Sequence, residues 1–411
     1  MHALIISSLK PPRPGIDVHG TYKRLALHIR ALHALGASLE IAYYVTDEDV
    51  PPDADLDAAA ARQEPAEAAH WGIPARVRLI RRRRPAGGFV SHYLEGMLSA
   101  GDQPAMAPWG GPEQAAAVGH LVDTGPDLVV VNNLHATTAL LRSGRRPKRL
   151  FFDLDDVQHR VRLRWCKQKP STPGKILMLT HIPALLLAER AAARAAEATF
   201  VCGEEDRAHL ARLGLPRVLL IPNAVDVPAQ TAELATEPRL LFVGAMGHGP
   251  NQEAAERLVR QILPLVRRQR PDALLALAGQ GSEALSFVAP EVVGVELLGF
   301  VPDISALYDR CAVFVCPMTN GGGTRIKLLE AAAFGLPIVS TTMGAEGLAL
   351  KDGVEIVLAE TDAALADACV ALLNAPASRA RIGEAGRCAI NKNFNSKTIQ
   401  KRLEQIFAGT T

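Results

Sequence analysis

The residues best suited to chemistry in this sequence lie between positions 320 and 330. The segment opens with three consecutive glycines, Gly321, Gly322 and Gly323. These glycines leave backbone N–H groups exposed, and Thr324 is predicted to cap a helix whose positive end points at the loop. Arg325 and Lys327 add two cations in the first turn of that helix. Exposed amides, a helix N-terminus and two cations suit a diphosphate better than a single carboxylate.

Glu330 adds a carboxylate to the same predicted helix. It lies one turn after Lys327, so both side chains fall on one helix face. A carboxylate there can accept hydrogen bonds from vicinal hydroxyl groups, such as those of a ribose. Taken alone, the segment also fits a surface turn followed by a solvated Lys327–Glu330 ion pair.

Composition limits the functions of the whole chain. Its 411 residues favour two domains, and a hydrophobic content of 48% supports well-packed cores. A net charge of +2 and an aromatic content of 5% argue against nucleic-acid binding. None of the six cysteines forms a C-x-x-C pair, which favours reduced cysteines in a cytoplasmic protein. The first residues are expected to form a strand rather than a signal peptide, and no apolar run is long enough to span a membrane.

Short apolar runs alternate with helical patterns along the chain. In the first half, strands are expected at 3–9, 39–45, 77–80, 128–132, 149–154, 198–202 and 218–221. In the second half, they are expected at 240–243, 274–278, 295–298, 313–317, 338–341 and 356–358. The Asp-, Ala- and Pro-rich segment 51–74 is expected to be irregular. Two such series predict two doubly wound α/β domains, whose parallel sheets bind ligands at the carboxyl ends of the strands.

Several short motifs follow one another in the second half of the chain. They are 221–226 (IPNAVD), 241–246 (LFVGAM), 277–281 (LAGQG), 298–303 (LGFVPD), 321–330 (GGGTRIKLLE), 335–341 (GLPIVST) and 344–347 (GAEG). In this order they resemble the retaining, GT-B-fold glycosyltransferases of family 4, the glycosyl transferases group 1. The resemblance covers residues 218–350 strongly and residues 1–217 weakly.

The resemblance implies two Rossmann-like domains that face each other across a cleft. Residues 1–220 would form the acceptor-side domain, and residues 221–395 would bind a nucleotide-diphosphate sugar as the donor. Residues 396–411 would form a last helix that crosses back to the N-terminal domain. The implied reaction transfers a sugar to a hydroxyl acceptor, a glycan, a lipid-linked molecule or a small molecule, in bacterial polysaccharide or glycoconjugate biosynthesis.

The resemblance also implies roles for individual residues. The glycine loop with Thr324, Arg325 and Lys327 would hold the diphosphate, and Glu330 would bind the ribose hydroxyls. The backbone near Phe300 and Val301, where the strand ends at Gly299, would meet the edge of the base.

Three residues outside these segments complete the expected site. Gly244, with the turn to His248, would close over the phosphates. Gly20, which follows the first strand and its loop, could approach the donor or the acceptor, and an ordinary turn explains it equally well. His135 follows a buried strand and is a candidate acceptor-site residue, with a helix-capping or loop histidine as the alternative.

The sequence departs from the family's pattern at two places. The family motif has two glutamates with seven residues between them; Glu330 matches the second, but Gly322 occupies the first position. The Arg/Lys pair that is usual after the first strand of the C-terminal domain is replaced by 247–251 (GHGPN). Because Arg325 and Lys327 can supply the missing charge, we expect an active, retaining hexosyltransferase that needs neither a metal nor a cofactor.

A group of acids raises the question of a metal site. Asp153, Asp155 and Asp156 follow a strand, and hard cations prefer such oxygen ligands. We favour helix capping and a place on the acceptor side for these residues, and we expect no metal site.

The sequence allows more than one reading of the surface contacts and of the function. The basic run 81–84 and the apolar stretch 176–187 could contact a membrane, although a basic run is usually a solvated face. We therefore expect a cytoplasmic protein, with peripheral contact at the inner membrane surface as an option. The alternatives are a nucleotide-sugar epimerase on the same fold, an inactive transferase-fold binding protein, and a dehydrogenase, for which no complete G-x-G-x-x-G is present.

Overall fold

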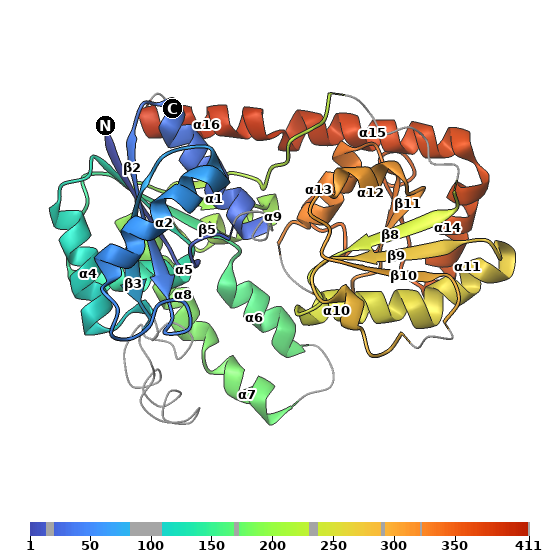
Figure 1. Cartoon of the computed structure of the whole chain (residues 1–411), viewed down its shortest axis with the longest axis horizontal. Coiled ribbons are helices and arrows are strands. Elements are labelled where there is room, and N and C mark those ends of the chain that lie inside the picture. Colours follow the sequence, from blue (N-terminus) through green and yellow to red (C-terminus); the bar gives the residue numbers. More distant parts are fainter. Residues whose placement is uncertain are drawn as a thin grey trace. The chain divides into compact units, whose positions relative to one another are not determined.

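A computed structural model describes residues 1–13, 20–82, 109–167, 172–229, 237–288, 292–320 and 323–409 of the chain. The chain divides into two compact units, shown in Figure 1. The N-terminal unit contains residues 1–222 and 400–411, and the C-terminal unit contains residues 223–399. Each unit is built around one parallel sheet, so the prediction of two doubly wound α/β units is confirmed.

The N-terminal unit holds a seven-stranded sheet of order β3-β2-β1-β4-β5-β6-β7. Its strands are β1 (His2–Ser7), β2 (Ser38–Val45), β3 (Arg76–Arg81), β4 (Leu128–Asn132), β5 (Leu150–Asp155), β6 (Ala198–Val201) and β7 (Val218–Leu220). The described helices are α1 (Gly20–Ala34), α2 (Leu56–Trp71), α4 (Pro112–Asp123), α5 (Leu134–Ser143), α6 (Gln158–Lys167), α7 (Pro173–Leu179), α8 (Ile182–Ala195) and α9 (Glu204–Arg212). The central strands are continuous apolar runs because helices cover both faces of the sheet.

The segment 51–74, which was predicted to be irregular, is mostly the helix α2. The carboxylate of Asp55 caps its N-terminus by accepting from the N–H of Asp57 at 2.8 Å, and Gly72 closes the other end with φ of 68°. Pro65 lies inside the helix. The prediction was wrong because caps at both ends and the high helix propensity of alanine outweigh the prolines.

The C-terminal unit holds a six-stranded sheet of order β10-β9-β8-β11-β12-β13. Its strands are β8 (Arg239–Val243), β9 (Leu274–Ala278), β10 (Val295–Gly299), β11 (Val313–Cys316), β12 (Ile338–Ser340) and β13 (Val357–Leu358). The described helices are α10 (Gly249–Arg257), α11 (Leu263–Gln269), α12 (Ser305–Asp309), α13 (Ile326–Ala333), α14 (Asp362–Asn374) and α15 (Pro376–Phe394). A π-helical turn, Leu258–Ile262, joins α10 to α11.

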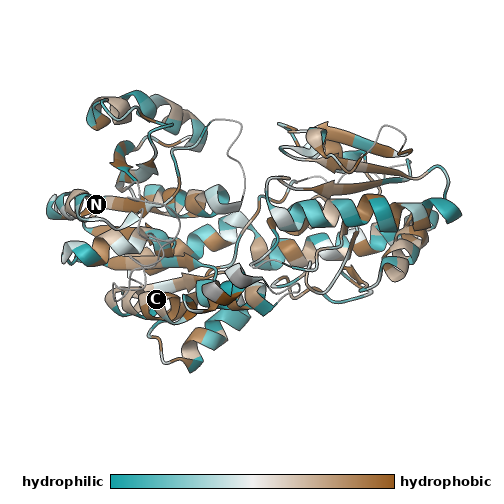
Figure 2. Ribbon diagram, turned by 90° about the horizontal axis from the view of Figure 1, so that it is seen from below, coloured by the Kyte–Doolittle hydropathy of each residue, from teal (hydrophilic) through white to brown (hydrophobic). Residues whose placement is uncertain are grey.

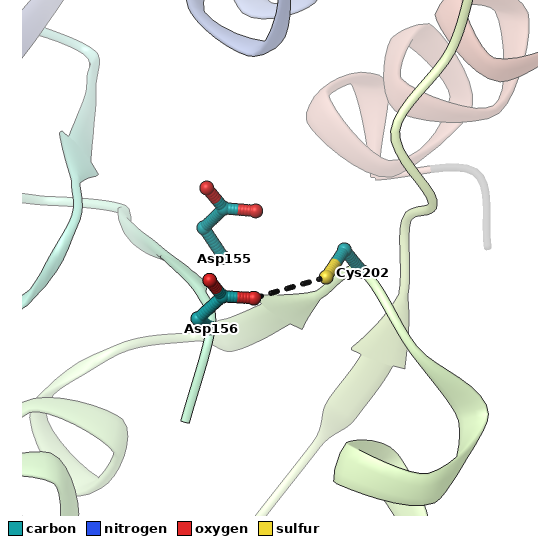
Figure 3. Close-up of side chains that lie close together, drawn as sticks. All are labelled: Asp155, Asp156 and Cys202. Carbon is teal, nitrogen blue, oxygen red and sulfur yellow. Dashed lines mark hydrogen bonds between the residues drawn. The ribbon is translucent and has the colours of Figure 1, made fainter. Parts of the chain in front are cut away.

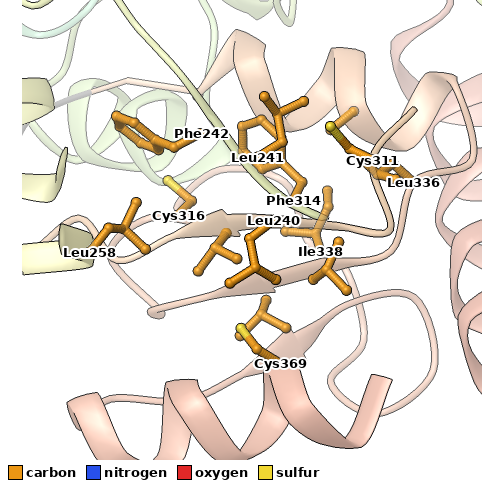
Figure 4. Packing of buried hydrophobic residues seen from close by; sticks show 14 of the residues in the cluster. Leu240, Leu241, Phe242, Leu258, Cys311, Phe314, Cys316, Leu336, Ile338 and Cys369 are labelled. Carbon is orange, nitrogen blue, oxygen red and sulfur yellow. The ribbon is translucent and has the colours of Figure 1, made fainter. Parts of the chain in front are cut away.

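The core of the C-terminal unit forms between this sheet and its helices (Figure 4). Phe242 and Phe314 are fully buried there, together with the free cysteines Cys311 and Cys316. Figure 2 shows the same division of polarity in both units, with hydrophobic strands and helices that carry hydrophilic faces. This packing fixes the strands whose ends position the candidate site.

Both sheets contain a point where the strand order reverses. In the N-terminal unit β1 pairs with β2 on one side and β4 on the other, and in the C-terminal unit β8 pairs with β9 and β11. At such a point two loops leave neighbouring strands in opposite directions and open a crevice at the carboxyl edge. The loops after β8 and β11 are therefore the natural ligand-binding elements of the C-terminal unit.

The last helix, α16 (Ser396–Ala408), contributes its final residues to the N-terminal unit. Phe407 is buried against Phe151 and Phe200, with ring centroids at 5.1 Å and 6.2 Å. Arg149 donates to the backbone oxygen of Phe407 and so holds the helix end. Among the described residues, no helix is both long and apolar enough to cross a membrane.

Candidate functional site

The candidate site begins where β8 and β11 end side by side. Leu240 and Leu241 of β8 pair in register with Val313 and Phe314 of β11. This pairing brings Gly244, which follows β8, to the segment that connects β11 to α13. Residues that lie about eighty positions apart in the sequence thus meet at one sheet edge.

Lys327 lies at the centre of this edge. Its Nζ donates to Oδ1 of Asn251 at 2.6 Å and lies 4.3 Å from the centre of the Phe242 ring. A Cβ added at Gly244 would come within 2.9 Å of the same Nζ. A side chain at position 244 would therefore displace the Asn251 amide or the Lys327 ammonium, and these two groups form one polar cluster with the Gly244 backbone.

Positive charge is concentrated around this polar cluster. The pKa of Lys327 is lowered to about 8, chiefly by burial, with Cys316 opposing the shift and Arg325 adding to it. The pKa of His248 is also lowered, by burial and then by Lys327 and Arg325. An anion bound beside Lys327 would relieve the repulsion among these groups and restore the full charge of Lys327.

The start of α13 differs from the prediction. The helix begins at Ile326 with Arg325 at its N-cap position, so Thr324 does not cap it. Gly323 turns the chain with φ of 69°, and Nη1 of Arg325 donates to the Gly323 oxygen at 2.5 Å. This turn delays the helix by one residue. The buried Thr324 hydroxyl instead lies beside Gly347, where an added Cβ would come within 3.0 Å of Oγ1.

Glu330 lies one turn further along α13 and is half-buried. Its Oε2 accepts from the hydroxyl of Tyr308 at 3.5 Å, while Lys327 donates to Asn251. Tyr308 is fully buried and stacks on Phe334 with ring centroids 4.9 Å apart. Tyr308 thus orients the Glu330 carboxylate, which lies one turn after Lys327 on α13 and can also accept from a ligand hydroxyl.

Phe300 and Val301 follow β10, which ends at Gly299 with φ of 63°. The N–H of Gly299 donates to Oγ of Ser282 at 2.9 Å, which fixes the backbone before the turn. The Phe300 side chain is 38% exposed, whereas Val301 packs on the core of the unit. Two other predicted site residues, Gly321 and Gly322, lie outside the described residues.

Two contacts of this site were not predicted from the sequence, those of Asn251 with Lys327 and of Tyr308 with Glu330. Asn251 carried a usable signal, because it ends the segment 247–251 in which the expected cations are missing. Tyr308 carried none, because it lies in the five-residue helix α12 and reaches Glu330 only through the fold.

The other predicted site residues, Gly20 and His135, lie in the N-terminal unit. Gly20 is the first residue of α1, and residues 14–19 before it lie outside the described residues. His135, in the first turn of α5, lies 4.7 Å from the ring of Trp109, which in turn lies under Arg82 at 3.9 Å. Burial and the charges of Arg82 and Arg162 lower the pKa of His135 to about 4. His135 is therefore neutral near pH 7 and can both donate and accept a hydrogen bond.

Asp153 is committed to a buried network that the sequence did not indicate. Both of its oxygens accept from Nε of Arg24 at 2.9 Å, and Oδ2 lies 2.7 Å from Nε2 of His28. Nδ2 of Asn132 donates to the same carboxylate at 3.2 Å. Arg24 also donates to the backbone oxygen of Ile221 at 2.8 Å. Asp153 thus joins α1, β4 and β5 instead of facing a ligand.

The other two acids of the segment lie with a thiol at the carboxyl edge of the sheet (Figure 3). Ligand atoms of Asp155, Asp156 and Cys202 all lie within 4.8 Å of one another, which a metal ion would require. Sγ of Cys202 donates to Oδ1 of Asp156 at 3.6 Å, and Nε of Arg24 lies 3.4 Å from Oδ1 of Asp155. Burial raises the pKa of Asp155 to about 7, although Arg24 lowers it, so a metal ion would have to displace a proton from this carboxyl near neutral pH.

Comparison with known proteins shows that the polar cluster lies within a family match. Residues 237–375 match the family model of glycosyl transferases group 1. The phosphatidyl-myo-inositol mannosyltransferase of Mycobacterium leprae is 33% identical over 196 residues, which cover 46% of this chain and 52% of that protein. A 44.6 kDa protein in the cps region of Klebsiella pneumoniae is 25% identical over 168 residues, 39% of this chain and 43% of that protein. The chain spans about half the length of the curated relatives it matches.

Solved structures resemble the chain over its whole length. Sucrose-phosphate synthase from Thermosynechococcus elongatus has a TM-score of 0.70 at 16% identity, covering 100% of this chain and 99% of that chain. HepE of Anabaena, in complex with UDP, has a TM-score of 0.67 at 13% identity and covers 100% of both chains. At such identities the likeness concerns the fold alone. Residues 237–375 thus match the glycosyl transferases group 1, and the chain as a whole has the fold of these solved structures, the GT-B architecture.

Proposed function

We propose that this protein is a retaining glycosyltransferase that takes a hexosyl group from a nucleotide-diphosphate sugar to a hydroxyl acceptor. The observation that carries the proposal is the polar cluster of Lys327, Asn251 and Gly244 at the strand-order reversal of the C-terminal unit. It lies within the family match. Relatives named mannosyltransferases and structures solved with UDP support a nucleotide-sugar donor.

The chemistry of such a transfer explains why cations are needed. Breaking the bond between the sugar and the diphosphate builds negative charge on the leaving group and positive charge on the sugar. Lys327 and Arg325 would stabilise the leaving diphosphate without having to move, since both are already fixed by hydrogen bonds. Glu330 would accept from the ribose hydroxyls, and the backbone at Phe300 and Val301 would meet the base.

The remaining roles in the proposal follow from the same scheme. With retention, the leaving phosphate accepts the proton of the acceptor hydroxyl, so the enzyme needs no nucleophile. His135, neutral at pH 7, and Gly20 would serve on the acceptor side. Gly321, Gly322, Gly323 and Thr324 would complete the phosphate loop. The enzyme would need neither metal nor cofactor, would act in polysaccharide or glycoconjugate biosynthesis, and would contact the membrane peripherally.

Nucleoside diphosphate binding is the first test. A thermal-shift screen with UDP, GDP, ADP, dTDP and CDP should give stabilisation by one of them. Slow hydrolysis of the matching nucleotide sugar without acceptor should follow, and NMR of the first-formed sugar should show the anomeric configuration of the donor.

Two outcomes would favour other functions. Conversion of the donor into an isomeric nucleotide sugar would favour an epimerase on the same fold. Tight nucleotide binding with no turnover, with or without candidate acceptors, would favour a binding protein that has lost activity.

A further inference from the structure

Three side chains stack at the carboxyl edge of the N-terminal sheet. Arg82 follows β3, Trp109 precedes α4, and His135 lies in the first turn of α5. The guanidinium carbon of Arg82 lies 3.9 Å from the centre of the Trp109 ring, and the centres of the Trp109 and His135 rings are 4.7 Å apart. This stack brings a cation, an indole and an imidazole together from separate parts of the unit.

Backbone hydrogen bonds hold the stack in place. The N–H of Arg82 donates to the backbone oxygen of Val45, at the end of β2, at 2.8 Å. The hydroxyl of Tyr44 donates to the backbone oxygen of Trp109 at 3.2 Å. Helix α5, which carries the third member of the stack, packs along α4. The three side chains are therefore positioned by the fold before any ligand arrives, which lowers the entropy cost of binding.

The side-chain N–H groups of Arg82 and Trp109 have no hydrogen-bond partner within the described part of the chain. Nε1 of Trp109 is buried without one. The preceding residue, Arg81, shows the contrast, because its guanidinium donates to Asp47 at 2.5 Å and to the backbone oxygen of Val50 at 2.9 Å. A buried donor without a partner costs free energy that a bound ligand can recover. The unpaired donors of the stack therefore indicate ligand binding.

The charges that act on His135 are positive. After the larger effect of burial, Arg82 and Arg162 of α6 both lower the pKa of His135. Burial also lowers the pKa of Arg82, and the carboxylate of Asp49 opposes this shift. That carboxylate already accepts from Nζ of Lys10 at 2.8 Å, so it does not fully balance the guanidinium. The stack would therefore attract an anion and repel a metal ion.

The chemistry of the stack selects the class of ligand. A guanidinium matches the geometry of phosphate and carboxylate groups, and an indole and a neutral imidazole add single hydrogen-bond donors. A nucleic acid would need an extended basic surface rather than one half-buried group of side chains. A neutral sugar would leave the guanidinium charge unbalanced. A small ligand with one phosphate or carboxylate group satisfies both the charge and the donors.

We propose that Arg82, Trp109 and His135 form a binding site for the phosphate or carboxylate group of an acidic ligand. Arg82 would bind two oxygens of the anion, Nε1 of Trp109 would donate to it, and Arg162 would add positive charge nearby. Because His135 belongs to the proposed acceptor side, the acceptor would be a sugar or glycan that carries this acidic group. The assignment to the acceptor rests on the proposed transferase function, whereas binding of the anion can be measured without it.

Titration calorimetry of the full-length protein with three related sugars tests the site. The probes are glucose 6-phosphate, glucuronate and glucose, which differ only in the group on carbon six. We expect one or both acids to bind at least about tenfold more tightly than glucose, and to bind more weakly as salt is raised. Tighter binding of glucose 6-phosphate would assign a phosphate group, and tighter binding of glucuronate would assign a carboxylate.

Variants of the stack should weaken the binding of the acids. Arg82→Gln removes the guanidinium and should weaken it by at least about tenfold. Trp109→Phe keeps an aromatic ring beside Arg82 but lacks the indole N–H, and should weaken binding by roughly threefold to tenfold. The control variant Arg145→Gln removes a guanidinium from an exposed pair with Asp123 of the same unit, and should bind the probes like the wild type.

Three results would overturn the inference. The first is binding of both acids no tighter than that of glucose. The second is wild-type binding of the acids by Arg82→Gln. The third is loss of binding in Lys327→Ala but not in Arg82→Gln, because the acids would then occupy the C-terminal unit.

Donor hydrolysis separates this inference from the proposed function. If the acids bind as expected but the protein neither binds a nucleoside diphosphate nor hydrolyses a nucleotide sugar, the proposed function fails and the anion site stands. If the protein hydrolyses the donor but binds neither acid more tightly than glucose, the anion site is wrong and the proposed function stands.

Discussion

Nζ of Lys327 donates to Oδ1 of Asn251 at 2.6 Å, although the two residues lie on different helices and 76 positions apart. The bond holds the ammonium beside Gly244, above the Phe242 ring. Asn251 is neutral, so it orients Lys327 without cancelling its charge. A carboxylate at position 251 would have formed an ion pair and would compete with an incoming anion.

Replacing Lys327 tests the proposed diphosphate site directly. Lys327→Ala should lower turnover of the nucleotide sugar by about a hundredfold, because a fixed cation is removed from the leaving group. It should also abolish the thermal shift caused by the nucleoside diphosphate. Lys351→Ala, at an exposed position of the same unit, should change neither. Near-normal turnover in Lys327→Ala would remove this lysine from the diphosphate site.

The lowered pKa of Lys327 predicts a pH dependence. With a pKa of about 8, the free enzyme loses the ammonium as pH rises through that value, so kcat/KM for the donor should fall on the alkaline side. Lys327→Arg should remove this fall, even if its activity is lower, because guanidinium stays charged. Rates measured between about pH 6 and pH 10 would show the difference. If kcat/KM of Lys327→Arg fell at alkaline pH as in the wild type, another group would be responsible for the fall.

Metal independence is the next prediction. Turnover should survive EDTA, since Lys327 and Arg325 supply the charge that a divalent cation would otherwise bring. Asp155→Asn/Asp156→Asn should leave any response to added metal unchanged. Loss of activity in EDTA, its return with manganese and its absence in the double variant would instead identify Asp155, Asp156 and Cys202 as a metal site.

The buried pair of Arg24 and Asp153 should stabilise the N-terminal unit strongly. Their side chains are 1% and 0% exposed, so Asp153→Asn removes the carboxylate that accepts from both Nε and Nη2 of a buried guanidinium and should cost about 3–5 kcal/mol. Asp123→Asn, in an exposed pair with Arg145, should cost at most about 1 kcal/mol. Urea denaturation at neutral pH would compare the two variants. Equal losses would contradict the assigned role.

The same pair predicts how the stability difference between the wild type and Asp153→Asn depends on pH. Burial alone would raise the pKa of Asp153, but Arg24 and His28 hold it well below its usual range. A depressed carboxyl pKa adds stability above the unfolded-state value of about 3.9, and this stability is lost as pH falls toward the folded-state value. The difference in the free energy of unfolding between the wild type and Asp153→Asn should therefore reach its full size at neutral pH and decrease only in acid.

The end of α16 should stabilise the N-terminal unit, although residues 223–399 of the sequence lie between them. Phe407 is 1% exposed among Phe151, Phe200 and His28, so Phe407→Ala should cost about 3–5 kcal/mol. Lys397→Ala, at an exposed position of the same helix, should have little effect. Calorimetry should show a lower Tm for Phe407→Ala, and removal of residues 396–411 should lower it further. An unchanged Tm in either would contradict this role.

The sequence determined the architecture because its signals are local. Apolar runs that alternate with helical patterns require parallel sheets covered on both faces, and most strands begin and end within two residues of the prediction. The glycine loop followed by Arg325, Lys327 and Glu330 needs only adjacent residues to be recognised. Helix starts were harder, as Thr324 and segment 51–74 show, because a cap depends on backbone angles set by neighbouring contacts.

Only the tertiary structure determined which residues that are distant in the sequence come into contact. Asn251 meets Lys327 because β8 and β11 are neighbours in the sheet, and Tyr308 meets Glu330 because α12 packs beside α13. Arg24 takes Asp153 away from any ligand for the same reason. These contacts join positions far apart in the chain, and their energies come from burial and electrostatics that exist only once the units have folded, so no local pattern in the sequence announces them.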